Sequence, residues 1–136
     1  MFEIAHSLAG QTVFIADLGL SRLLLKNDRN YPWVILVPRR ENITEIFDLD
    51  LDERTLLIEE ISTTSALMKK MFNGDKMNVA ALGNVDPQLH VHIIVRRKND
   101  KAWPKPVWGA APEAPYTEEE CKTLAARIAA AVREAF

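Results

Sequence analysis

Two histidines alternate with apolar residues inside the segment Leu89–Ile94, in the middle of a 136-residue chain. Successive side chains of a β-strand point to opposite faces, so the pattern predicts a strand with Gln88, His90 and His92 on one face and apolar residues on the other. Neutral imidazole is a nucleophile and a proton carrier near pH 7, with an ordinary pKa of about 6.5. We therefore expect a sheet with one face buried in the hydrophobic core and the other face carrying side chains that can react.

The rest of the chain predicts an α+β fold, with a mainly antiparallel sheet and a long helix packed on one face. The apolar run 33–37 ends at Pro38 and is typical of a strand buried on both faces. The long helix has a capping pair at Asp50 and Glu53 and a stop signal at Asn73-Gly74. The predicted elements are a hairpin at 12–17 and 21–26, strands at 33–37 and 77–82, and helices at about 51–72 and about 117–134.

The length and composition favour one domain over residues 1–136. We expect a motif-bearing core at about 12–98, an irregular loop rich in tryptophan and proline at 99–116, and a C-terminal helix capped by Thr117 and Glu120. The formal net charge of -2 argues against a polymeric nucleic acid as partner, but it leaves a small anionic ligand possible. Cys121 is the only cysteine and no apolar segment has membrane-spanning length, so we expect a cytoplasmic protein that does not contact a membrane.

The segment Gln88-Leu89-His90-Val91-His92-Ile93-Ile94 resembles the motif of the histidine-triad (HIT) superfamily of nucleotide hydrolases and transferases, with its first histidine replaced by glutamine. That motif is His-x-His-x-His followed by two apolar residues. The order of the predicted elements from about Val13 to Arg96 is also similar to a HIT domain. The loop 84–88 and the following Trp-Pro segment resemble a bacterial branch described as diadenosine-tetraphosphate-hydrolase-like.

This resemblance implies catalytic roles for the motif residues. His90 would attack the α-phosphorus of a nucleotide and form a nucleotidyl-imidazole intermediate that water hydrolyses, with its other ring nitrogen held by an acceptor such as a backbone carbonyl. His92 would contact phosphate oxygens and help to neutralise their charge. Gln88 can donate a hydrogen bond but cannot protonate a leaving group, so good leaving groups such as a nucleoside phosphate should be favoured over an alkylamine.

The resemblance also implies a set of binding residues. Asn27 or Asp28, in the turn before the buried strand, would hold the ribose, and Asn84 would reach the phosphates. Two further expectations come from the chain itself: Arg96 continues the strand face of His90 and His92 and would meet an approaching anion, and Trp108 in the proline-rich loop would cover a neighbouring active site. Each has a structural alternative, since asparagine and aspartate form turns and arginine is usually a solvated surface residue.

Other functions remain open from the sequence. Zinc needs three or four protein ligands, and only His6, Cys121 and carboxylates could join the two motif histidines, so we expect no metal site and no cofactor beyond Mg²⁺ carried by the substrate. A nucleotide-binding sensor without turnover, a nucleotidyl transferase and a purely structural histidine pair are the alternatives. The favoured hypothesis is a homodimeric hydrolase of dinucleoside polyphosphates or nucleotide conjugates, which pairs through the long helix or the edge of the motif strand.

Overall fold

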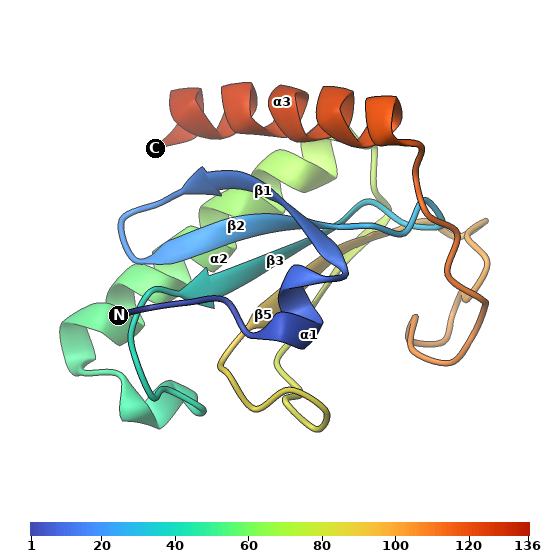
Figure 1. Ribbon diagram of the computed structural model, residues 1–136. Helices are drawn as coiled ribbons and strands as arrows, with labels where there is room; N and C mark the ends of the chain where they lie inside the picture. The colour runs from blue at the N-terminus through green and yellow to red at the C-terminus, as the bar shows by residue number, and fades with distance from the viewer.

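A computed structural model describes all residues, 1–136, and contains one five-stranded antiparallel sheet (Figure 1). Its strand order is β1-β2-β3-β5-β4, and every neighbouring pair is antiparallel. The predicted α+β class is therefore confirmed. The strands are β1 (Thr12–Asp17), β2 (Ser21–Lys26), β3 (Trp33–Pro38), β4 (Lys76–Ala80) and β5 (Val91–Arg96).

The histidine strand β5 lies inside the sheet, between β3 and β4, and not at an edge. His92 pairs with Ile35 on one side and with Ala80 on the other. The strand begins at Val91, so Gln88 and His90 precede it without ladder pairing, and the chain bends at Gln88. The prediction that all three polar motif residues share one strand face is therefore wrong for Gln88, whose side chain turns elsewhere.

The two long helices, α2 (Leu51–Met71) and α3 (Glu118–Ala135), pack on the same face of the sheet (Figure 1). Both predicted capping boxes are present, at Asp50 and at Thr117, and Asn73 ends α2 with a positive φ of 50°. The core between helices and sheet is built from Leu and Val side chains of β2, β3 and β5 and from Leu57, Met68 and Ile128. The sequence predicted both helices because their caps and apolar spacing are local signals.

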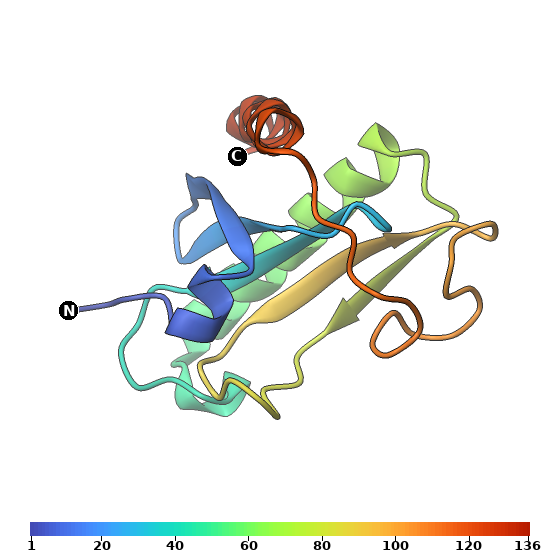
Figure 2. The same cartoon turned by 45° about the vertical axis from the view of Figure 1, so that its right-hand side comes forward.

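The opposite face of the sheet is covered by two segments with little regular structure. The short helix α1 (His6–Ala9) lies over one end, and the loop that joins β5 to α3 lies over the other (Figure 2). They bury a second apolar cluster that includes Leu8, Ile35 and Val107. A 3₁₀ turn, η1 (Ile46–Asp48), precedes α2. No helix combines the length and the apolar character that spanning a lipid bilayer requires.

Candidate active site

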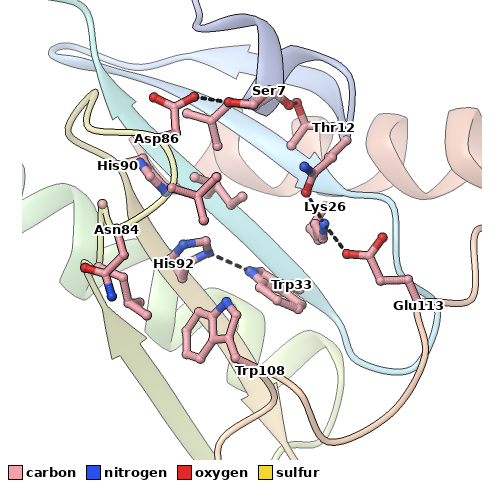
Figure 3. Close-up of a pocket in the computed structure, with 16 residues that line it drawn as sticks. Ser7, Thr12, Lys26, Trp33, Asn84, Asp86, His90, His92, Trp108 and Glu113 are labelled. Carbon is pink, nitrogen blue, oxygen red and sulfur yellow. Dashed lines mark hydrogen bonds and ion pairs between the residues drawn. The ribbon is translucent and has the colours of Figure 1, made fainter.

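A cavity of about 250 Å³ lies on this second face, where β5 begins (Figure 3). The sheet forms its floor, α1 forms one wall, and the loops before β5 and before α3 form the others. His90 and His92 lie toward one side, and Lys26 lies at the opposite end. The lining residues are Ser7, Leu8, Gln11, Thr12, Lys26, Trp33, Ile35, Leu82, Gly83, Asn84, Val85, Asp86, His90, His92, Trp108 and Glu113.

His90 is held by the backbone of its own motif. Its Nδ1 lies 2.6 Å from the carbonyl oxygen of Gln88. A carbonyl oxygen only accepts hydrogen bonds, so Nδ1 carries the hydrogen and Nε2 keeps its lone pair. The Gln88 carbonyl is thus the acceptor that a nucleophilic role for His90 needs, and the ring is buried within the cavity wall.

His92 is held in the opposite tautomer by a neighbouring strand. The indole Nε1–H of Trp33 donates to Nδ1 of His92 at 3.0 Å. An indole N–H can only donate, so Nδ1 has no hydrogen and neutral His92 carries its hydrogen on Nε2. Burial, together with smaller contributions from charge repulsion by His90 and Lys26, lowers the pKa of His92 to about 3. His92 therefore offers a ligand a hydrogen bond and not the positive charge that a protonated imidazole would supply.

Aromatic rings enclose His92 and explain its desolvation. The His90 and His92 ring centroids are 4.9 Å apart with an edge-on arrangement. Trp33 lies 5.6 Å from His92 and Trp108 lies 5.0 Å from it, both edge-on. Trp108 thus covers the site of its own chain. Trp33 is not among the predicted site residues, and its only sequence signal is its place at the start of the strand that pairs with β5.

Gln88 is absent from the cavity wall, although it was predicted as a catalytic residue. Its side-chain Oε1 accepts from the backbone N–H of Ala5 at 2.8 Å, and its Nε2 donates to the carbonyl of Glu3 at 2.8 Å. Both ends of the amide are thereby used by the N-terminal segment. The Gln88 amide does not titrate near neutral pH, and its hydrogen bonds aim it at the N-terminal segment and not at the cavity.

Asn27 and Asp28, predicted to bind ribose, do not line the cavity either. Asn27 Oδ1 accepts from the backbone N–H of Tyr116 at 2.9 Å. Asp28 is buried, and its Oδ1 accepts from the N–H groups of Asn30 at 3.0 Å and Ala114 at 3.4 Å. The turn is occupied by the segment that precedes α3, which the sequence placed 86 or more residues away.

The segment docked on that turn brings a charged pair to the far end of the cavity. Lys26 is only 5% exposed, and its Nζ lies 2.7 Å from Glu113 Oε1 and 2.7 Å from Gln11 Oε1. The ammonium also lies 5.5 Å from the centre of the Trp33 ring. Neither charged residue is among the predicted site residues, because a lysine that ends an apolar strand and a glutamate in an irregular loop belong to no motif.

The remaining predicted binding residues divide into two groups. Asn84 and Trp108 line the cavity. Arg96 does not: it is 1% exposed, and its guanidinium pairs with Asp100 at 2.8 Å and donates to Asn78 Oδ1 at 2.9 Å. The alternation of β5 places Arg96 on the face of His92, but the loop that follows the strand closes over it. Its donors pair with protein acceptors and its side chain is buried away from the cavity, and the role predicted for Arg96 with an approaching anion stays a prediction.

The cavity contains further polar groups but no metal-ligand cluster. Ser7 Oγ donates a hydrogen bond to Asp86 Oδ2 beside His90 (Figure 3). Nowhere in the chain do three or more histidine, cysteine, aspartate or glutamate side chains meet in an arrangement that could hold a metal ion. The two imidazoles are the groups of the cavity that can act as nucleophile and as neutral hydrogen-bond donor.

Residues 9–99 match the HIT domain. The chain belongs to the histidine-triad family. This HIT protein is similar over nearly its whole length to a histidine triad protein from Marinobacter aquaeolei VT8, with 46% identity, a TM-score of 0.95 and coverage of 100% and 99% of the two chains. A histidine triad protein from Bradyrhizobium japonicum has 44% identity, a TM-score of 0.91 and coverage of 99% and 98%.

A more distant structure shares the fold of this HIT protein. The diadenosine triphosphate hydrolase of Plasmodium falciparum, solved in complex with cyclomarin A, has 20% identity and a TM-score of 0.64, with coverage of 89% of this chain and 76% of that one. Among curated proteins, no sequence matches this chain.

Proposed function

We propose that this HIT protein is a nucleotide hydrolase that cleaves at the α-phosphate of dinucleoside polyphosphates or nucleotide conjugates. The supporting observation is that His90 and His92 are held in opposite tautomers. The Gln88 carbonyl leaves a lone pair on His90 Nε2, and the Trp33 indole leaves a hydrogen on His92 Nε2. A nucleophile beside a neutral hydrogen-bond donor suits attack on phosphorus, because the donor can stabilise charge that builds on a phosphoryl oxygen.

The proposed reaction has two displacements at phosphorus. In the first, His90 Nε2 attacks, an N–P bond forms, and the P–O bond to the leaving group breaks with its electron pair going to the leaving oxygen. In the second, water attacks the same phosphorus, the N–P bond breaks, and the lone pair returns to Nε2 while the water proton passes to solvent. His92 and Asn84 donate to the phosphoryl oxygens in both steps.

The missing first histidine restricts the leaving group. Gln88 cannot donate a proton to it at neutral pH, and its amide is bound to the N-terminal segment. Leaving groups that depart as stable anions, such as a nucleoside phosphate, are therefore favoured over an alkylamine. The shared fold of the Plasmodium diadenosine triphosphate hydrolase and the resemblance of loop 84–88 to the diadenosine-tetraphosphate-hydrolase-like branch support this substrate class.

The other end of the cavity receives the nucleoside in this proposal. Because Asn27 and Asp28 bind the segment before α3, we assign the polar contacts with the sugar to Lys26 and Glu113. Trp108 lies over His92 at the centre of the cavity. Mg²⁺ would arrive with the substrate. Three expectations stay predictions: that the protein holds no cofactor, that it has no polymeric nucleic-acid or membrane partner, and that it is cytoplasmic.

The decisive experiment is acid-quenched chromatography of diadenosine triphosphate and tetraphosphate after incubation with the wild type and with His90→Asn. We expect AMP from the wild type alone, because asparagine offers no nucleophilic ring nitrogen. Binding of AMP to both proteins, measured by calorimetry, is the control for an intact cavity.

The alternative function is a nucleotide sensor, and the lack of a leaving-group acid favours it. If neither protein releases product while the wild type still binds AMP, hydrolysis of these substrates is excluded and the sensor is supported. Transfer of the nucleotidyl group to an added alcohol in preference to water would instead identify a nucleotidyl transferase.

A further inference from the structure

Gln88 corresponds to the first histidine of the motif that the sequence resembles, and both side-chain hydrogen bonds of Gln88 go to the N-terminal segment. Oε1 accepts from Ala5 N at 2.8 Å and Nε2 donates to Glu3 O at 2.8 Å, so one amide pairs with two backbone groups that lie two residues apart. The amide thus accepts from one backbone N–H and donates to one backbone carbonyl, as a residue of a neighbouring β-strand would. A histidine could not reproduce it, because its neutral ring has one donor and one acceptor fixed on opposite sides.

The segment that Gln88 holds is a wall of the cavity. Ser7, Leu8 and Gln11 all line it, and Gln11 also holds the ammonium of Lys26 at 2.7 Å. Helix α1 has only four residues, which is far below the length at which a helix is stable by itself. Its position therefore depends on tertiary contacts, namely the burial of Leu8 and the bonds from the loop before β5.

The loop before β5 connects this wall directly to the proposed nucleophile. Asp86 accepts from Ser7 Oγ through one carboxylate oxygen and from the backbone N–H of Gln88 at 3.1 Å through the other. The carbonyl of Gln88 accepts from His90 Nδ1. Gln88 thus orients the nucleophile with its backbone and the cavity wall with its side chain.

We propose that Gln88 is a positioning residue that fixes the N-terminal segment as the wall of the nucleotide cavity. It acts on ligand binding through residues 3–11 and takes no part in proton transfer. This inference rests on the proposed nucleotide site, but it predicts a change in the N-terminal segment that does not depend on turnover.

The first test is hydrogen exchange of the full-length protein without ligand. Gln88→Ala should accelerate exchange of the Ala5 amide and of the amides in α1, while those of β5 stay protected. Gln88→Glu keeps an acceptor for the Ala5 N–H but loses the donor to the Glu3 carbonyl. The exchange rates of these amides in Gln88→Glu should therefore lie between those of the wild type and those of Gln88→Ala. Unchanged exchange in Gln88→Ala would overturn the proposal, whatever the protein's activity.

The second test is a double-mutant cycle in the full-length protein with Ala5→Pro. Proline removes the backbone N–H that Gln88 Oε1 accepts, and the φ of -56° at Ala5 is compatible with a proline ring. For diadenosine tetraphosphate, Gln88→Ala should raise KM about tenfold, the order expected from loss of two hydrogen bonds, and change kcat less than twofold. In the Ala5→Pro background the same substitution should raise KM by only about threefold, since one of its two partners is gone. Asn84→Ala is the matched control: it lines the cavity without a hydrogen bond to Ala5, so its effect should be the same in both backgrounds.

Two outcomes separate this inference from the proposed function. If Gln88→Ala lowers kcat equally with and without Ala5→Pro, Gln88 acts on the substrate and the positioning role is wrong. If the wild type shows no turnover, the cycle is measured with the Kd of AMP, and a smaller Gln88→Ala effect in the Ala5→Pro background supports the positioning role while the hydrolase proposal fails.

Discussion

At the scale of single residues, the hydrogen-bond partner of Nδ1 sets the tautomer of each histidine in the site. The partner of His90 Nδ1 is a carbonyl oxygen, and the partner of His92 Nδ1 is an indole N–H. The two contacts impose opposite tautomers on two chemically identical side chains. Trp33 is therefore more than a core residue, because it decides which His92 nitrogen can face a ligand.

Replacing Trp33 should change the titration of His92. Trp33→Phe keeps an aromatic ring but removes the donor to Nδ1, so that nitrogen becomes free to take a proton. We expect the pKa of His92 to rise from about 3 by about one unit, and kcat/KM to fall about tenfold, because the Nε2–H donor is no longer imposed. NMR titration of labelled imidazoles measures the first effect. Trp108→Phe is the control, since the Trp108 ring lies nearly perpendicular to His92 and makes no hydrogen bond to it. Equal titration curves for Trp33→Phe and the wild type would contradict a role of the Trp33 N–H.

His92 should also make the folded protein sensitive to acid. Its pKa is lowered on folding from 6.5 to about 3, so between these values the unfolded chain binds more protons than the folded one. The free energy of unfolding should therefore fall as pH drops below about 6.5, by at most about 1.4 kcal/mol per pH unit from this group. Urea titrations at a series of pH values test this. His92→Asn should have the shallower dependence between pH 6.5 and pH 4, and parallel curves would exclude the effect.

At the scale of elements, one buried carboxylate joins α2 to the first hairpin. Glu60 is fully buried in the middle of the helix, and its Oε2 accepts from Leu20 N at 2.7 Å while Oε1 accepts from Ser21 N at 3.1 Å. These are the backbone groups where β2 begins, so the carboxylate takes the place of a backbone acceptor there. The apolar spacing of α2 predicted its core-facing side but not this polar contact.

Removal of the Glu60 carboxylate should destabilise the fold without changing the site. Glu60→Ala leaves two buried N–H groups without an acceptor, which should cost about 3 kcal/mol of unfolding free energy. The site lies on the other face of the sheet, so AMP affinity of the folded variant should match that of the wild type. Chemical denaturation and calorimetry check the two parts. Glu59→Ala, one residue earlier and exposed, should change stability by less than about 0.5 kcal/mol, and a similar loss in both variants would contradict a specific role for Glu60.

At the scale of the whole molecule, the predicted homodimer must use a surface other than the motif strand. β5 lies between β3 and β4, so it has no free edge. Helix α2 keeps three large apolar residues exposed, of which Leu51 at 68% and Ile58 at 60% are the most exposed. The face of α2 that carries Leu51 and Ile58 is the helical surface expected for pairing.

Light scattering during size-exclusion chromatography should give twice the chain mass of 15.4 kDa. Ile58→Lys should shift the protein toward the monomer, because a buried unpaired ammonium is costly in an apolar interface. Ala126→Lys adds the same charge on the exposed side of α3 and should leave the dimer unchanged. A monomeric wild type would refute the dimer, and a dimeric Ile58→Lys would move the interface away from α2.

The sequence by itself determined the features whose signals are local. Alternating His90 and His92, the capping boxes at Asp50 and Thr117, and the apolar run of β3 act within a few residues, so the α+β elements and the HIT motif followed from them. The tertiary structure alone decided how the polar groups are used. Three hydrogen bonds of the site and its surroundings join residues that are far apart in the sequence. The separation is 59 residues for Trp33 and His92, 83 for Gln88 and Ala5, and 86 for Asp28 and Ala114. Side-chain hydrogen bonds depend on which strands and loops become neighbours, and no periodicity in the chain encodes that choice.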